Sequence, residues 1–193
     1  MTKKIVLVTG GTRSGKSVFA ENYAQRKGKN IAYIATAQIY DKEMQARVDL
    51  HRRRRPENWT TYEAPYNAGE AIKIAARHCD TILFDCLTIY TSNLLLAANA
   101  PTDKTERSLA ITSAIDQLLA SAASCNATVI FVTNEVGMGI VPENALAREY
   151  RDLAGLANQQ VAARADEAYL VVSGIAVNIK KLAVQLSKED ENG

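Results

Sequence analysis

The stretch IVLVTGGTRSGKS, residues 5–17, indicates the fold more clearly than any other part of the sequence. Its first residues are almost all apolar, which is typical of a buried β-strand. The next eight match the pattern G-x-x-x-x-G-K-S, and a helical pattern begins at the lysine. A strand, a glycine-rich loop and a helix in this order are the context of a phosphate-binding loop. We therefore predict that a nucleoside triphosphate is bound by Gly10, Gly11, Thr12, Arg13, Ser14, Gly15, Lys16 and Ser17.

Each residue type in this loop has a chemical reason. Glycines allow backbone N–H groups to curl around phosphate oxygens, and the N-terminus of the following helix adds positive potential. Lys16 is placed to reach the β- and γ-phosphates as a catalytic group, and Ser17 is placed to ligate Mg²⁺. A plain glycine-rich turn is disfavoured because the four-position match is rare by chance, and the flanking strand and helix make it rarer.

Short apolar runs alternate with helical patterns along the chain. Besides residues 5–10, we predict strands over 30–36, 81–85, 128–134 and 167–174, and helices over 16–26, 68–77, 105–124 and 144–165. The last helix has the clearest period, with one predicted core face formed by Leu146, Tyr150, Leu153, Ala157 and Val161. This alternation predicts an α/β fold with a mostly parallel central sheet and helices on both faces. In such sheets ligands bind beyond the carboxyl ends of the strands.

The composition limits the class of protein. A chain of 193 residues, 47% apolar and 23% charged, fits a single domain over residues 1–186 with a polar tail at 187–193. The net charge of +2 is too small to indicate a nucleic-acid or membrane partner. The three cysteines contain no C-x-x-C pair, so neither a disulfide framework nor a zinc site is predicted. No run approaches the roughly 18 apolar residues of a membrane span, and we expect a cytoplasmic protein.

Asp85 closes the predicted strand 81–85, at the edge of the sheet where the phosphate loop also lies. A carboxylate there would ligate Mg²⁺ through a water molecule. It would equally accept hydrogen bonds from the N1–H and N2–H₂ groups of guanine, or cap the helix that follows. The sequence does not choose between these three roles.

The segment HRRRRPENW, residues 51–59, places a histidine before four arginines at the end of a predicted helix, 41–56. On an ordinary protein His51 would be a partly buried helix residue and the arginines a solvated basic turn. Near a triphosphate site, arginines would pair with phosphate oxygens and stabilise charge in a transition state. Nearby cations also keep an imidazole neutral and nucleophilic. His51 is therefore a candidate to attack an α-phosphorus and split a nucleotidyl transfer into two steps.

Four blocks of the sequence resemble one enzyme family. They are GGTRSGKS from residue 10, YIATAQIYDKEMQARVDLHRRRRPENWTTYEAP from residue 33, VTNEVGMGIVPENALAREYRDLAGLANQQVA from residue 132 and VVSGIAVNIK from residue 171. In these blocks the chain is similar to the bifunctional adenosylcobinamide kinase and adenosylcobinamide-phosphate guanylyltransferase family of cobalamin biosynthesis. The first block is shared with many nucleotide-binding proteins, whereas H-R-x-x-R-P-x-x-W and VTNEVGMGIVPE are specific to this family.

The resemblance implies a RecA-like P-loop NTPase domain, usually a homotrimer, that acts on a small corrinoid substrate. Such an enzyme phosphorylates the hydroxyl of adenosylcobinamide with ATP or GTP. It then transfers GMP from GTP onto that phosphate, giving GDP-adenosylcobinamide and pyrophosphate. By likeness His51 aligns with the histidine that carries GMP. The positions expected by likeness to contact the nucleotide are Ala35, Thr36, Ala37, Arg52, Arg53, Arg54, Arg55, Glu63 and Asp85, the last two at the guanine.

Two other functions fit part of the sequence. A simple small-molecule kinase would use the phosphate loop without a covalent step and would not need His51. A nucleotide-binding switch would need a guanine-reading N-K-x-D element, which the sequence lacks. The loop NEVGMGIVPE, residues 134–143, leaves the predicted ligand edge of the sheet, and the roles of lid, corrinoid contact and plain structural connection stay open for it.

Overall fold

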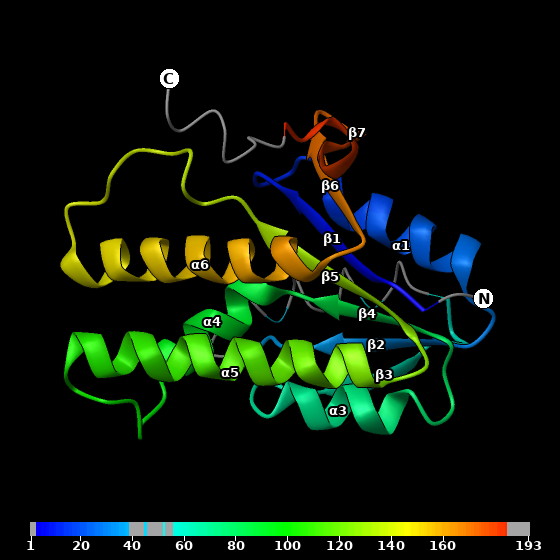
Figure 1. Cartoon of the computed structure of the whole chain (residues 1–193), viewed down its shortest axis with the longest axis horizontal. Coiled ribbons are helices and arrows are strands. Elements are labelled where there is room, and N and C mark those ends of the chain that lie inside the picture. Colours follow the sequence, from blue (N-terminus) through cyan, green and yellow to red (C-terminus); the bar gives the residue numbers. More distant parts are fainter. Residues whose placement is uncertain (1–2, 39–44, 46–51, 53–55, 185–193) are drawn as a thin grey trace, which may run out of the picture.

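The structure, a computed structural model, describes residues 3–38, 45, 52 and 56–184 (Figure 1). In this part of the chain seven strands form one sheet: β1 (Ile5–Gly10), β2 (Ile31–Ala35), β3 (Thr60–Glu63), β4 (Thr81–Asp85), β5 (Thr128–Asn134), β6 (Glu167–Val172) and β7 (Ile175–Asn178). Their order across the sheet is β3-β2-β4-β5-β1-β6-β7. Neighbouring strands are parallel except β6 and β7. The predicted α/β fold with a mostly parallel sheet is confirmed.

Helices cover both faces of this sheet. Within the described ranges they are α1 (Lys16–Lys27), α3 (Ala68–Ala75), α4 (Leu87–Leu95), α5 (Lys104–Ser124), α6 (Ala145–Arg164) and the short 3-10 helix η1 (Ile179–Leu182). Helices α3, α5 and α6 lie in one layer, and α1 lies on the opposite side of the sheet (Figure 1). The phosphate loop joins β1, near the middle of the sheet, to α1.

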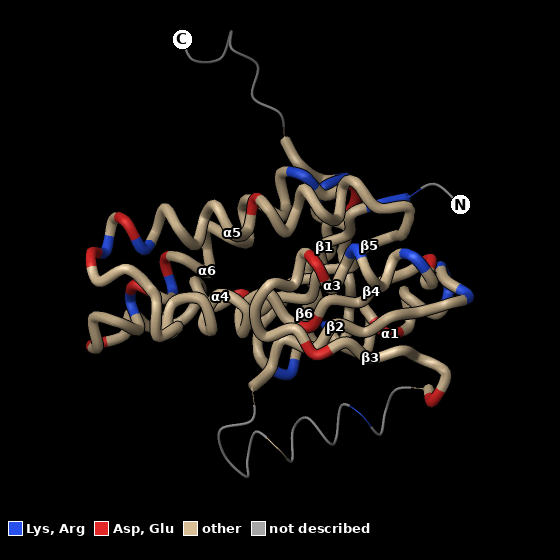
Figure 2. Tube along the Cα trace, turned by 90° about the horizontal axis from the view of Figure 1, so that it is seen from below, with Lys and Arg blue, Asp and Glu red and all other residues tan. Residues whose placement is uncertain are grey.

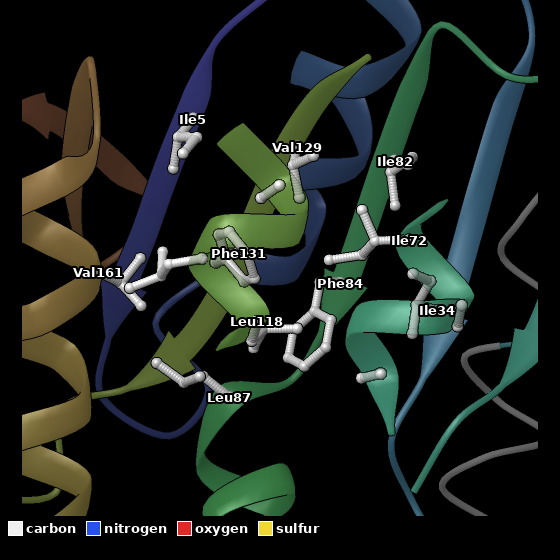
Figure 3. Close-up of a cluster of buried hydrophobic side chains, with 14 of the residues drawn as sticks. Ile5, Ile34, Ile72, Ile82, Phe84, Leu87, Leu118, Val129, Phe131 and Val161 are labelled. Atoms are coloured by element: carbon white, nitrogen blue, oxygen red, sulfur yellow. The ribbon is translucent and has the colours of Figure 1, made fainter. Parts of the chain in front are cut away.

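Two buried layers explain why the strands read as continuous apolar runs. On one face the rings of Phe84 and Phe131 lie 5.2 Å apart between centroids, and Leu118 of α5 and Val161 of α6 belong to the same cluster (Figure 3). On the other face a second cluster joins the small residues of α1, such as Ala20, to the strands. Strands buried on both faces lose the alternation of polar and apolar residues that marks a half-exposed strand.

The predicted strands and helices outside residues 41–56 begin and end within two residues of those observed. Four elements within the described ranges were missed: β3, β7, α4 and the single-turn 3-10 helix η1. Strands β3 and β7 lie at the two edges of the sheet and mix exposed with half-buried positions, so their sequences show no buried run. Helix α4 is buried on most sides and has no side-chain hydrogen bond at its N-cap, so neither a helical period nor a start signal marks it.

The predicted core face of α6 is wrong at Leu146, which is 45% exposed, whereas Leu153 on the same predicted face is 3% exposed. The reason is that the first turns of α6 project beyond the sheet (Figure 1). The predicted helix 41–56 lies outside the described residues except for Gln45, Arg52 and Pro56, and the first two of these are helical.

Acidic and basic residues are interspersed over the described chain (Figure 2). This distribution agrees with the small net charge of the sequence. None of the helices in the described ranges is long and apolar enough to cross a membrane.

The carboxylate of Glu167, at the start of β6, binds side chains of α1 and of the residue before β1. Glu167 accepts hydrogen bonds from the hydroxyl of Tyr23 at 2.8 Å and from that of Tyr169 at 2.7 Å, and it pairs with Lys4. Burial by itself raises the pKa of Glu167, but the donors Lys4, Tyr169 and Tyr23 outweigh it and lower the pKa to about 2. The carboxylate therefore contributes to stability while it is ionised.

We expect Glu167→Gln to flatten the dependence of stability on pH. Because folding lowers the pKa of Glu167, its contribution is present above the unfolded-state pKa of 4.5 and is lost as the pH falls toward about 2. Urea unfolding at several pH values should show the free energy of unfolding of the wild type falling more steeply below about pH 5 than that of the variant. Glu70→Gln, which removes an exposed ion pair with Lys73, is the matched control and should leave the slope unchanged. Parallel curves for wild type and Glu167→Gln would contradict the assignment.

Candidate active site

The predicted phosphate loop lies between the end of β1 and the start of α1. The chain turns there at Arg13 and Gly15, whose φ angles are 59° and 95°. The N–H of Ser14 donates to the carbonyl oxygen of Gly11 at 3.2 Å, and Nζ of Lys16 donates to the same oxygen at 3.2 Å. These bonds close the backbone into a concave loop, the shape in which successive N–H groups bind an anion.

The first turn of α1 carries no side chain that competes with an anion. Its N-cap is Gly15, which cannot cap the helix with a side chain, and the turn contains no acidic residue. The first N–H groups of a helix have no partner inside the helix, and the helix dipole favours negative charge beside them. The buried hydroxyls of Thr9 and Ser14 also have no hydrogen-bond partner among the described residues. This set of donors fits the phosphates of a nucleotide.

Two glycines of the loop have no room for a side chain. A Cβ on Gly10 would lie 2.6 Å from Oγ of Ser14 and closer still to the carbonyl oxygen of Val171. A Cβ on Gly15 would lie 3.0 Å from Cα of Gly174, at a φ angle that other residue types rarely adopt. The glycine pattern is thus required by contacts with β6 and the turn after it. Sequence reasoning assigned these glycines to phosphate binding and did not predict the contacts.

Asp85 lies at the same edge of the sheet as the loop, but not on the strand next to β1. Strand β5 is inserted between β1 and β4, and Asp85 pairs with Val132 of β5. Burial lowers the pKa of Lys16, whereas Cys86 and Asp85 raise it. The carboxylate is therefore within electrostatic reach of the lysine of the loop. The N-cap of α4 is Cys86, so Asp85 does not serve as the cap of that helix.

Tyr33 holds the carboxylate of Asp85. Its hydroxyl donates to Oδ2 of Asp85 at 2.7 Å across the neighbouring strands β2 and β4. The ring of Tyr33 is 5% exposed and belongs to the core cluster on the α1 face, which fixes its position. Sequence reasoning missed this residue because a tyrosine inside an apolar strand is typical of ordinary core.

Thr36, predicted by likeness to contact the nucleotide, is fully buried and ties β2 to β4. Its hydroxyl accepts from the N–H of Cys86 at 2.8 Å and donates to the carbonyl of Cys86 at 3.0 Å. Nδ2 of Asn93 donates to the carbonyl of Thr36 at 2.8 Å. The side chain therefore shapes the edge of the sheet, and its neighbours Ala35 and Ala37 are half-buried on either side.

A polar group between the loop and Asp85 was also missed. Asn134, the last residue of β5, pairs with Gly10 in the sheet, and its Nδ2 donates to Oγ1 of Thr88 at 3.3 Å. The same oxygen lies 3.1 Å from Sγ of Cys86, a thiol whose pKa burial raises to about 11. Asn158 of α6 donates to the carbonyl of Asn134 at 3.2 Å. Only Asn134 carried a sequence signal, its place at the end of a strand, because Asn158 lies inside a helical pattern and Cys86 and Thr88 lie at the start of a helix that the sequence does not mark.

Arg52 and Glu63 are brought together, but away from the loop. Nη2 of Arg52 lies 2.7 Å from Oε1 of Glu63 in an ion pair that is exposed on both sides. Glu63 ends β3, which is four strands from β1, and a spacing of about 4.8 Å per strand puts about 19 Å between them. The candidate nucleophile and three of the predicted arginines, His51, Arg53, Arg54 and Arg55, lie outside the described residues.

The residues present fit a magnesium ion that is shared with a nucleotide. Ser17, in the first turn of α1, supplies a hydroxyl, and Asp85 supplies a carboxylate at the same edge of the sheet. Mg²⁺ prefers such oxygen ligands and completes its shell with water and substrate phosphates. No cluster of three or more His, Cys, Asp or Glu side chains that would hold a metal occurs in the described part of the chain. The ion would thus depend on the phosphates for part of its shell.

The loop between β5 and α6 is fastened to α6 by two arginines. Arg151 donates to the carbonyl of Gly137 at 2.6 Å, and Arg148 donates to the carbonyl of Glu143 at 2.6 Å. Three apolar side chains between these anchors are strongly exposed: Met138, Ile140 and Val141. The loop is therefore held at both ends and presents an exposed apolar tip on the segment that follows the carboxyl end of β5.

Comparisons with known proteins agree with this site. Residues 6–179 match the family described as cobinamide kinase / cobinamide phosphate guanyltransferase. The chain is 46% identical over 181 residues to the bifunctional adenosylcobalamin biosynthesis protein CobU of Escherichia coli. The aligned residues cover 91% of this chain and 99% of that protein. CobU of Salmonella typhimurium gives the same identity and coverage. The bifunctional protein CobP of Pseudomonas aeruginosa is 37% identical over 174 residues, covering 90% of this chain and 96% of that protein.

Among solved structures, the chain resembles an ATPase from the type III secretion system of pathogenic bacteria, with a TM-score of 0.59. The identity is 12%, over 97% of this chain and 61% of the ATPase, so the likeness concerns the fold alone. It supports the expected P-loop NTPase architecture. With a family match over most of its length and relatives at 37% to 46% identity, the chain belongs to the cobinamide kinase / cobinamide phosphate guanyltransferase family.

Proposed function

We propose that the chain catalyses both reactions for which its family is described. It phosphorylates adenosylcobinamide with ATP or GTP, and it then transfers GMP from GTP to adenosylcobinamide phosphate. The products of the second reaction are GDP-adenosylcobinamide and pyrophosphate. The names of the relatives support the pair of activities. The observation that carries the proposal is the closed loop at residues 10–17. Helix α1 begins there without a side-chain cap, and Lys16 of the loop lies within electrostatic reach of Asp85.

In the first reaction the loop holds the triphosphate. The N–H groups at the start of α1 and Nζ of Lys16 bind the phosphate oxygens, while Ser17 and Asp85 would hold a magnesium ion. Such an ion would offset negative charge on the phosphates. The hydroxyl oxygen of adenosylcobinamide attacks the γ-phosphorus, and the bond from that phosphorus to the bridging oxygen breaks. The nucleoside diphosphate leaves, and the hydroxyl proton passes to water.

In the second reaction a covalent intermediate divides the transfer into two displacements. A neutral imidazole nitrogen of His51 attacks the α-phosphorus of GTP, so that a P–N bond forms as the bond to pyrophosphate breaks. An oxygen of adenosylcobinamide phosphate then attacks the same phosphorus, the P–N bond breaks, and the imidazole is released neutral. Arg52, Arg53, Arg54 and Arg55 offset the charge of the phosphates in both displacements.

The assembly, the corrinoid contact and guanine recognition complete the proposal. A homotrimer in the cytoplasm is proposed from the likeness to the family. Contact of the corrinoid with the loop 134–143 is proposed because the apolar tip of this loop lies on the chain segment that leaves β5 beside Gly10. Guanine recognition by Glu63 is proposed together with its partner Arg52.

The covalent step is tested by labelling. We expect GTP labelled on the α-phosphate to transfer acid-labile, alkali-stable label to the wild-type protein in the presence of Mg²⁺. GTP labelled on the γ-phosphate should not, and omission of Mg²⁺ should abolish the transfer. The variant His51→Ala should take up no α-label, whereas His78→Ala, which removes the other histidine of the chain, should label like the wild type.

Labelling with the same yield in His51→Ala would show that His51 is not the nucleophile. No α-label in the wild type, with adenosylcobinamide phosphate absent, would leave a small-molecule kinase that uses the phosphate loop without a covalent step.

The orientation of Asp85 by Tyr33 gives a second test. Tyr33→Phe removes the hydroxyl that donates to Asp85 and keeps the ring that fills the core. Loss of such a supporting hydrogen bond typically costs about tenfold or more in metal affinity or activity. We therefore expect the Mg²⁺ concentration for half-maximal phosphorylation of adenosylcobinamide to rise by about this factor.

The matched control is Tyr62→Phe. Tyr62 lies on the neighbouring strand β3 and packs in the cluster on the opposite face of the sheet. An unchanged Mg²⁺ requirement in Tyr33→Phe, or an equal rise in both variants, would exclude a role of Asp85 in holding the metal through this contact.

A further inference from the structure

The turn between β6 and β7 lies directly against the phosphate loop. It consists of Ser173 and Gly174, whose φ angles of 52° and 80° are both positive, as a two-residue type I′ hairpin turn requires. The N–H of Gly174 donates to the carbonyl oxygen of Ser14 at 2.8 Å. Its Cα lies 3.0 Å from where a Cβ of Gly15 would be. One hydrogen bond and one close backbone contact thus join the turn to the loop.

Strand β6 extends this contact to the start of the loop. The carbonyl oxygen of Val171 occupies the space that a side chain on Gly10 would need, and the side chain of Val171 is fully buried in the cluster on the α1 face. Both glycines that define the loop motif therefore touch the β6–β7 hairpin. The hairpin forms one wall of the loop.

The hydrogen bond fixes the direction of an N–H group that binds phosphate. In a trans peptide the carbonyl of one residue and the N–H of the next point to opposite sides. Because the carbonyl of Ser14 points to Gly174, the N–H of Gly15 points away from the hairpin. That N–H is one of the donors that such loops turn toward phosphate oxygens.

We propose that Gly174 is a positioning residue of the nucleotide site, and that the β6–β7 turn sets the affinity of the phosphate loop by orienting the peptide between Ser14 and Gly15. This inference rests on the proposed nucleotide function of the loop. It explains why the sheet ends in an antiparallel hairpin at this place. The turn has to bring a backbone N–H to the loop at a φ angle that glycine adopts without strain.

The test is Gly174→Ala. A Cβ on Gly174 would meet nothing within 4 Å, so the substitution causes no clash and acts through the backbone, which resists a φ of 80° with any side chain. Relief of that strain moves the N–H away from Ser14. In the presence of Mg²⁺, calorimetry should show that the dissociation constant of the protein for a non-hydrolysable ATP analogue rises about fivefold or more. The thermal midpoint of unfolding should fall only by a few degrees.

The matched control is Asn67→Ala. Asn67 also has a positive φ angle, 52°, but it precedes α3 and makes no side-chain cap there. The same kind of strain is thus introduced on the other helical layer, away from the loop. We expect a similar fall of the thermal midpoint and an unchanged dissociation constant.

Gly174→Asn keeps the test decisive if the alanine variant does not fold. Asparagine tolerates positive φ angles better than alanine, so its dissociation constant should lie between those of the wild type and Gly174→Ala. A Gly174 variant that is folded and binds the nucleotide as tightly as the wild type would overturn the inference. An equal weakening in Asn67→Ala would do the same. Absence of nucleotide binding in the wild type itself would instead refute the proposed function.

Discussion

The contact between the phosphate loop and the β6–β7 hairpin is the constraint on which the site depends. Gly10 and Gly15 have to lack side chains because the backbone of the hairpin fills the space beside them. In return, the hairpin holds the carbonyl of Ser14, and the start of α1 next to it has no side-chain cap and no acidic residue that would compete with an anion. The loop is thereby prepared before a nucleotide arrives, which lowers the entropic cost of binding.

The order of the strands decides which side chains can act together. Strand β5 separates β1 from β4, so Asp85 is not a direct neighbour of the loop. Tyr33 holds its carboxylate, and Asn134 ends the strand that lies between Asp85 and the loop. Glu63 lies about 19 Å away at the edge strand, where it pairs with Arg52. One edge of one sheet thus offers a phosphate loop near its centre and a charged pair near its end. This separation suits a family described by two activities, a kinase and a guanyltransferase.

The central strands and most helices were predictable because burial on both faces gives long apolar runs, and because the loop motif fixes how β1 meets α1. The edge strands β3 and β7 and the buried helix α4 were not, since exposure on one side or burial on all sides removes the period that marks an element. The structure places Lys16, Ser17 and Asp85 at one edge of the sheet, as their positions in the motif and at the end of a strand predict. Tyr33 and Gly174 were not, because their roles follow from neighbours distant in sequence: Asp85 for one, and the Ser14–Gly15 peptide for the other.

The most direct test of this account is the binding of Mg²⁺ with ATP or GTP to the wild type and to Lys16→Met, measured by calorimetry. Methionine keeps the length and the apolar stem of the lysine and removes the positive charge that the loop carries within electrostatic reach of Asp85. The account predicts saturable binding of one triphosphate per chain in the wild type and a loss of affinity of at least about tenfold in a variant that keeps the wild-type thermal midpoint within a few degrees. Equal affinity in the two proteins would mean that the nucleotide binds elsewhere and that the loop is not the centre of the site.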